Sequence, residues 1–162
     1  MTRTQHHHPG DGCTGELRLL TQQDRSDVQH LTRRILTATA EHRYADVEQH
    51  GDHLALHYGP VGEYACAITA ARACTTTTPD TTAATPLLTH LQHRHRTTTP
   101  ADTHTLHAAT TAVSTFITAV HHHPHHAEHA LTAIYEGPTS QALSFTALLL
   151  THAAHHPTPP PA

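Results

Sequence analysis

The chain has little cysteine, no long apolar stretch, and no lysine or asparagine at all. Its three cysteines, Cys13, Cys66 and Cys74, are an odd number with no secretory apolar segment before them. This pattern argues against a disulfide framework and favours a reducing cytoplasm. The longest apolar run, residues 147–150, is far shorter than the roughly 20 residues of a membrane-spanning helix. We therefore expect a soluble, cytoplasmic protein without a membrane segment.

Large apolar side chains are also scarce, because 16 Leu, 4 Ile, 5 Val and 2 Phe make up only 27 of the 162 residues. That share lies below the level of about 20% at which disorder is expected. Disorder also calls for a high net charge, whereas the formal net charge is only -4 and 14% of residues are charged. We expect a folded middle with loose ends and a thin core in which alanine fills many positions.

The charge balance argues against a nucleic-acid partner. All nine basic residues are arginine, 13 acidic residues outnumber them, and the only basic stripe in the sequence is the stretch from Arg94 to Arg96. His90, His93 and His95 interleave with these arginines. The favoured interpretation is a solvated helix end whose positive groups complement the helix dipole, and a contact with phosphate is the alternative.

Histidine is the one residue type with useful side-chain chemistry that is unusually abundant, with 22 in the chain. Thr, Ala, His and Pro dominate together, as a C-rich coding strand would produce, so mutational bias alone explains much of this abundance. Protonation of every imidazole would move the formal net charge from -4 to +18 below about pH 6. This potential change motivates the hypothesis of an acid-responsive protein whose helices repel one another at low pH.

The patterning predicts a mainly α fold with a small helical bundle in the C-terminal half. The predicted parts are a disordered leader (residues 1–20), a helix followed by a β-hairpin (21–74), a Thr-rich linker (75–85), the helical bundle (86–156) and a Pro-rich tail (157–162).

An amphipathic helix is predicted over residues 24–50. Its inward positions recur at spacings of three and four residues, at Val28, Leu31, Ile35, Ala38, His42 and Ala45. Thr21 and Asp24 form the pattern of a capping box, and Gly51 suits the left-handed residue that ends a helix. On this stripe, His42 is expected to be a partly buried, hydrogen-bonded core residue rather than a ligand.

Two runs of alternating residues predict the β-hairpin. Leu54, Leu56 and Tyr58 alternate with other residues before Gly59, and the alternation resumes after Gly62. The competing interpretation is a helix from Pro60 to Cys74, favoured by its alanines and by proline at a first helical position.

Four helices are predicted in the C-terminal half, over residues 86–95, 100–123, 125–136 and 139–156. Thr85-Pro86 and Thr99-Pro100 each place a capping hydroxyl before a proline, Pro124 ends one helix and Gly137 ends the next. Short loops predict an antiparallel bundle. The last helix carries Leu143, Ala147, Leu150 and Ala154 inward.

The densest histidine cluster suggests a metal site. His125 and His129 stand four residues apart on a predicted helix with Glu128 between them, and two imidazoles with a carboxylate can bind zinc. His152 and His156 on the last helix would complete the site if the two helices are antiparallel. The favoured interpretation is that these side chains are exposed polar residues of a biased composition.

No common cofactor, hydrolase or metalloprotease motif occurs in the chain, which lowers the expectation of an enzyme without excluding one. Three hypotheses follow. The first is a small helical binding or interaction module, with a protein partner or a second copy of the chain as its ligand. The second is a buffer or sensor of Zn, Ni or Cu, and the third is the acid-responsive protein.

Overall fold

The computed structural model describes residues 20–95 and 102–155. The leader, except for Leu20, and the whole tail predicted from the sequence lie outside these ranges. The described residues form six helices and confirm the mainly α fold. The helices are α2 (Gln22–Ala40), α3 (Tyr44–Arg72), α4 (Thr81–Arg94), α5 (Thr103–His122), α6 (Pro124–Tyr135) and α7 (Thr139–His155).

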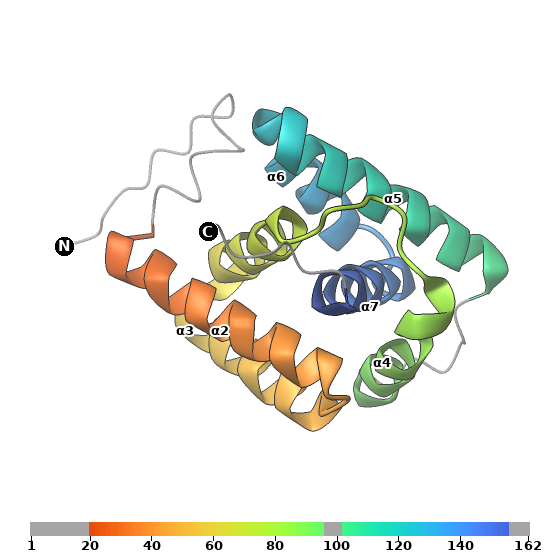
Figure 1. Cartoon of the computed structure of the whole chain (residues 1–162), viewed down its shortest axis with the longest axis horizontal. Helices are drawn as coiled ribbons and strands as arrows, with labels where there is room; N and C mark the ends of the chain where they lie inside the picture. Colours follow the sequence, from red (N-terminus) through yellow and green to blue (C-terminus); the bar gives the residue numbers. More distant parts are fainter. Residues whose placement is uncertain (1–19, 96–101, 156–162) are drawn as a thin grey trace.

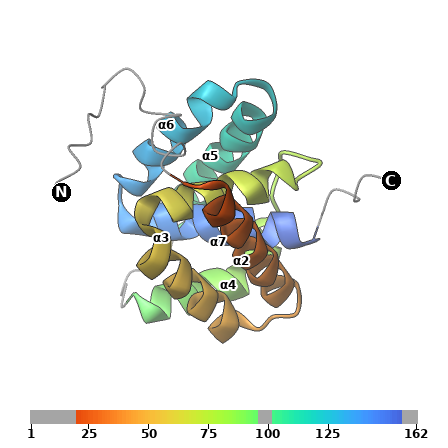
Figure 2. The ribbon, with the colours of Figure 1, turned by 90° about the vertical axis from the view of Figure 1, so that its left-hand side faces the viewer.

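Helix α7 lies at the centre, and each of the other five helices contacts it. Figure 1 looks nearly along α7 with its neighbours around it, and Figure 2 shows its length. Leu148 and Leu149 are as deeply buried as the predicted inward residues Leu143 and Ala147. A helix that is apolar on every side is stable only inside a fold. Helix α7 is therefore the centre of the core, and the buried side chains around it form one continuous cluster.

Helix α2 begins as the sequence predicts. Thr21 Oγ1 accepts a hydrogen bond from Asp24 N at 3.0 Å, and Asp24 Oδ2 accepts one from Thr21 N at 3.2 Å. These two bonds satisfy amide groups that the first helical turn leaves without partners. The predicted core positions Val28, Leu31 and Ile35 are buried.

The prediction of one helix over residues 24–50 is wrong, because α2 ends at Ala40 and the chain reverses into α3. His42 makes the reversal with a φ of 59°, and it is exposed rather than part of the core. Its Nδ1 atom lies 2.7 Å from the Tyr44 hydroxyl. The spacing of three and four residues in the sequence runs across the turn, although the residues before and after it belong to two different helices. Gly51 does not end a helix and lies inside α3.

The predicted β-hairpin is also wrong, because residues 53–72 belong to α3. Leu54 is 3% exposed, whereas Leu56 is 83% exposed, so the two do not share a buried strand face. Leu54 and Tyr58 are four residues apart and lie on one side of a helix. A run of six alternating residues is compatible with the periodicity of a strand and with that of a helix. The structure confirms the alternative prediction, a helix beginning at Pro60.

A kink divides α3 into two straight halves. Gly59 has φ 63° and ψ -155°, a conformation that is essentially restricted to glycine. Pro60 follows as the first residue of the second half, where its missing N–H leaves no hydrogen bond unmade. Gly62 then lets the second half approach Tyr58, since a Cβ atom on Gly62 would collide with the Tyr58 Cβ. These residues set the direction in which α3 continues.

The remaining helices match their predicted ranges closely, except at the start of α4. That helix begins at Thr81 rather than at Pro86, because Asp80 Oδ1 accepts hydrogen bonds from Thr82 N at 2.9 Å and Ala83 N at 3.3 Å. Helix α5 is capped in the same way by Asp102, whose Oδ1 accepts from Thr105 N at 2.7 Å. In the described ranges, no helix combines the length and apolarity needed to cross a membrane.

Replacing Gly59 with alanine tests the kink. Neither Gly59 nor Gly51 has an atom within 4 Å of the position that a Cβ would take, so the two substitutions differ mainly in backbone conformation. We expect Gly59→Ala to lower the free energy of unfolding by about 1–3 kcal/mol. Gly51→Ala, inside a regular helical segment, should raise it by up to about 1 kcal/mol. Urea denaturation of both variants makes the comparison, and equal effects would contradict the kink.

Candidate ligand-binding pocket

A cavity of about 380 Å³ lies between α3, α4 and α7, with contributions from α2 and α6. This volume is in the range of small-molecule sites. We call it the α3–α7 pocket. Its apolar lining consists of Ile35, Val47, Leu54, Ala67, Leu91, Ala142, Leu143, Leu149 and Leu150.

The kink in α3 shapes this pocket. Glu48 and Leu54 line it from the first half of α3, and Glu63 and Cys66 line it from the second half. A straight helix of this length could not place both groups around one cavity, because residues 48 and 66 would be about 27 Å apart along its axis. The opposite wall comes from successive turns of α7.

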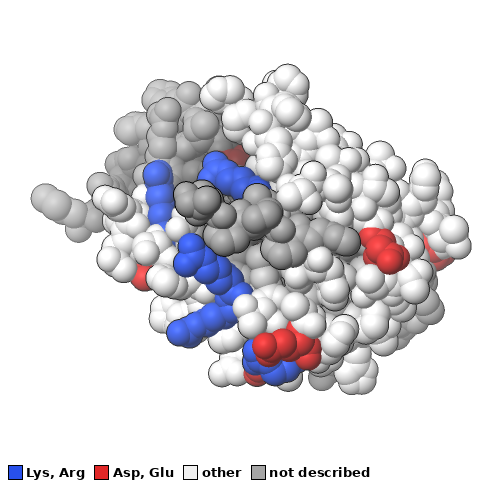
Figure 3. Space-filling view, viewed as in Figure 1, with Lys and Arg blue, Asp and Glu red and all other residues white. Residues whose placement is uncertain are grey.

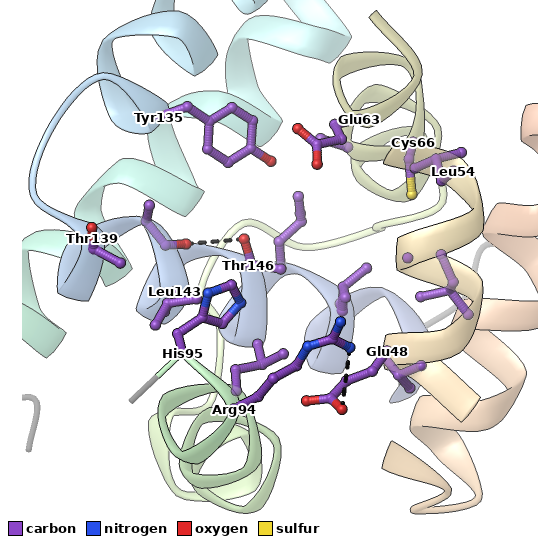
Figure 4. A pocket seen from close by; sticks show the side chains of 18 residues that line it. Glu48, Leu54, Glu63, Cys66, Arg94, His95, Tyr135, Thr139, Leu143 and Thr146 are labelled. Atoms are coloured by element: carbon purple, nitrogen blue, oxygen red, sulfur yellow. Dashed lines mark hydrogen bonds and ion pairs between the residues drawn. The ribbon is translucent and has the colours of Figure 1, made fainter. Parts of the chain in front are cut away.

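Polar groups gather at the two ends of the pocket. Figure 4 shows the carboxyl group of Glu63 and the phenol of Tyr135 near one another at one end, with Glu48, Arg94 and His95 at the other. Apolar side chains line the cavity between these two ends. The pocket can therefore hold a molecule with a long apolar body and a polar group at an end.

The Arg94 end is already neutralised by the chain's own carboxylates. Arg94 Nη1 lies 3.3 Å from Glu48 Oε2, and Arg94 Nη2 lies 2.5 Å from Asp52 Oδ2. Hydrogen bonds to Asp52 and Glu48 raise the pKa of Arg94. His90 Nε2 lies 3.2 Å from the other Glu48 oxygen. With its guanidinium held by two carboxylates, Arg94 is a poor partner for an incoming anion.

The Glu63 end carries a carboxyl group that has no counterion among the residues that the structure describes. Within the described residues, no hydrogen bond or ion pair joins the Glu63 carboxyl group to another side chain. Partial burial raises the pKa of this carboxyl group. The residue as a whole is exposed, so it stands at the mouth of the pocket with its carboxyl group turned to the cavity.

Tyr135 is held in place by two other aromatic rings. Its ring stacks on Tyr64 at a centroid distance of 5.8 Å and meets Phe145 edge-on at 6.3 Å. Burial raises the pKa of the Tyr135 phenol, and the nearby Cys66 and Glu63 raise it further. The phenol is therefore protonated at neutral pH, and it offers a hydroxyl group beside the Glu63 carboxylate.

The two described cysteines, Cys66 and Cys74, form no disulfide and are unreactive at neutral pH. Burial raises the pKa of Cys66 to about 11 and that of Cys74 to about 12. Both thiols therefore remain protonated at neutral pH, and a protonated thiol is neither a nucleophile nor a metal ligand.

Four of the five residues of the predicted metal site lie within the described ranges. His125 and His129 are exposed on α6, Glu128 is 2% exposed, and His152 is 3% exposed on α7. His156 lies outside the described ranges. Across residues 20–95 and 102–155, no three His, Cys, Asp or Glu side chains are grouped as metal ligands. The metal site remains a prediction from spacing.

His152 and His121 instead contact the chain just after α3. His152 Nε2 donates to Thr76 O at 2.7 Å, and His121 Nε2 lies 3.1 Å from Cys74 O and 3.2 Å from Ala71 O. The imidazoles from α5 and α7 thus contact backbone carbonyl groups at the end of α3 and in the segment that follows it. These histidines connect the end of α3 to the core.

Sequence reasoning did not find the pocket residues Glu63 and Tyr135. They are 72 residues apart, and neither belongs to a motif. Pro60 within an alanine-rich stretch was the available signal, since a helix there places Glu63 one turn after its start. Comparison of the chain with protein-family models, with curated proteins and with solved structures finds no match.

Glu63→Gln tests whether the ionised carboxyl group of Glu63 lowers the stability of the folded state. The folded-state pKa of Glu63 is above its ordinary value of 4.5, so ionisation disfavours the folded state as the pH rises through that region. Removing the charge should raise the melting temperature at pH 7 and leave it unchanged below about pH 4. Glu136→Gln, at an exposed position outside the pocket, is the control. A lower melting temperature for Glu63→Gln at pH 7 would contradict this electrostatic effect.

His152→Phe tests the contact between α7 and the end of α3. Phenylalanine fills the buried space but cannot donate to Thr76 O, so an acceptor loses its partner. We expect a loss of about 1–3 kcal/mol in the free energy of unfolding. The exposed His104, on α5, gives the matched substitution His104→Phe, which should change stability by less than about 0.5 kcal/mol. Equal losses in the two variants would show that the Thr76 contact contributes nothing.

Proposed function

We propose that this chain is a small helical binding module, and that the α3–α7 pocket holds a small molecule with an apolar body and a positively charged nitrogen. The observation that carries the proposal is an apolar cavity with the Glu63 carboxyl group at its mouth, where no described side chain pairs with it. Buried apolar surface supplies the affinity of such sites, and a few polar groups set the orientation of the ligand.

The charges around the pocket favour a cation. Glu63 has no counterion among the described residues, and an ammonium group beside it would gain a charge-assisted hydrogen bond. At the other end, Arg94 is held by Glu48 and Asp52, so a carboxylate ligand would have to compete with two carboxylates already in place. Amines are thus favoured over fatty acids of the same length.

The apolar surface of the described residues favours an internal ligand over a flat protein interface. Leu56 is the one large apolar side chain found exposed in residues 20–95 and 102–155. A docking surface for a partner protein normally presents a contiguous apolar patch. The other apolar side chains are directed into the core and the pocket.

Binding also fits the pocket better than catalysis does. The Tyr135 phenol and the Cys66 thiol both have raised pKa values, so neither is an activated nucleophile at neutral pH. Glu63 has a hydroxyl group beside it and no positioned partner that would form a nucleophile–base pair. The chemistry of the lining residues is that of recognition.

Octylamine, octanol and octanoate form a matched series that tests the proposal. Chemical shifts of the methyl groups of Leu54, Leu143 and Leu150 report on occupancy of the pocket by NMR titration. We expect octylamine to bind most tightly. Glu63→Gln should lower the affinity for octylamine by about tenfold, to that for octanol, because one charge-assisted hydrogen bond is lost. Glu136→Gln should leave all three affinities unchanged.

Two outcomes would overturn the proposal in different ways. Equal affinities for octylamine and octanol, with no effect of Glu63→Gln, would contradict the proposed preference for a positively charged ligand. No shift of the pocket methyl groups with any member of the series would remove the binding site itself. The metal and acid-response hypotheses stay predictions, because no contact among the described residues favours either.

A further inference from the structure

A second hollow, separate from the pocket, lies between α2 and the first half of α3. Its volume is about 240 Å³, and we call it the α2 groove. Every residue that lines it carries an N–H or O–H donor, and no carboxylate lines it. The lining residues are His30, Arg33, Arg34, Thr37, Arg43 and His50.

Helix geometry assembles this set from a sequence that shows no basic stripe there. His30, Arg33, Arg34 and Thr37 follow the spacing i, i+3, i+4, i+7, so they share one face of α2. That face is opposite to the buried stripe that contains Leu31. The one basic stripe visible in the sequence is Arg94 to Arg96. In the folded chain, residues from the start of α3 join the α2 face to form a second basic group.

The two α3-side groups complete the groove. Arg43 precedes α3, and Glu41 Oε2 accepts from its Nε at 2.6 Å while Asp46 pairs with its Nη1. These two carboxylates neutralise Arg43, as Glu48 and Asp52 neutralise Arg94, so Arg43 forms a wall of the groove without adding an unpaired charge. His50 lies two turns further along α3 and is only partly exposed. The arginine side chains gather on the face of the molecule that carries α2, as Figure 3 shows.

Arg33 and Arg34 are exposed, and they have no ion-pair partner within residues 20–95 and 102–155. This differs from Arg94, where two carboxylates neutralise the guanidinium and remove the contact with phosphate considered from the sequence. Neighbouring cations repel one another, so an anion between them relieves an unfavourable interaction.

We propose that the α2 groove binds the phosphate group of a small phosphorylated molecule. A phosphate monoester presents three terminal oxygens, whereas a carboxylate presents two. The unpaired guanidinium groups of Arg33 and Arg34 present planar donor sets that match phosphate oxygens. The hydroxyl of Thr37 and the two imidazoles supply further donors around the same space. This site is independent of the ligand proposed for the α3–α7 pocket.

The test uses inorganic phosphate, glycerol phosphate and acetate as probes, at pH 7.0 and constant ionic strength. NMR titration follows the arginine side-chain Nε–H signals and the backbone amides of residues 30–50. We expect both phosphates to shift Arg33 and Arg34 at lower concentration than acetate does. The double variant Arg33→Gln/Arg34→Gln should weaken phosphate binding by at least about tenfold, since it removes the unpaired cations.

Arg72→Gln is the matched control, because Arg72 is an exposed arginine on α3 that does not line the groove. It should leave the affinity for phosphate unchanged. Equal weakening by Arg72→Gln would mean that phosphate senses only the overall charge, and equal affinity for acetate would mean no selectivity for phosphate. Tight binding of a single-stranded oligonucleotide without measurable binding of glycerol phosphate would show an extended nucleic-acid surface instead. Any of these three results would overturn the proposal.

Discussion

The burial of α7 on all sides is the constraint on which the rest of the structure depends. Its middle turns carry Leu148, Leu149 and Phe145 in directions that one neighbouring helix could not cover. Each such side chain contributes about 1.5–3 kcal/mol when it is removed from water, so leaving any face of α7 open would cost a large part of a small domain's stability. The other helices therefore surround α7, and short side chains elsewhere let them approach it closely. This explains how a chain with few large apolar residues still has a continuous core.

The shape of α3 follows from the same constraint and creates the pocket. Helix α3 has 29 residues and bends at Gly59, and it contacts α7 and the helices around it. Gly59 supplies the bend at a defined point, and the two halves of α3 then face α7 from different directions. The space between them is not filled by side chains, and it becomes the α3–α7 pocket. The charges of the chain are likewise separated by helix packing, with a carboxyl group at the pocket and unpaired arginines over α2.

Local signals in the sequence predicted local structure well, because the forces behind them act over one helical turn. The capping box of Thr21 and Asp24 marks the start of α2, and the predicted ranges of the last three helices agree closely with α5, α6 and α7. Short alternating runs were misleading, since Leu56 fits a strand pattern but is exposed on a helix. The candidate site could not be predicted, because Glu63 and Tyr135 meet only when α3 and α6 have packed around α7. The abundance of histidine suggested a metal site, whereas the one buried imidazole among the described residues, that of His152, contacts a carbonyl group after α3.

The orientation of a bound amine is the most direct test of the central claim that α7 and the bent α3 enclose a ligand site with a charged mouth. Intermolecular nuclear Overhauser effects between octylamine and the protein report which end of the ligand lies where. The account predicts contacts from the methylene group next to nitrogen to the Tyr135 ring, and from the terminal methyl group to Leu91 and Leu150 near the Arg94 end. Contacts in the reverse orientation, or contacts only to residues outside the α3–α7 pocket, would contradict it.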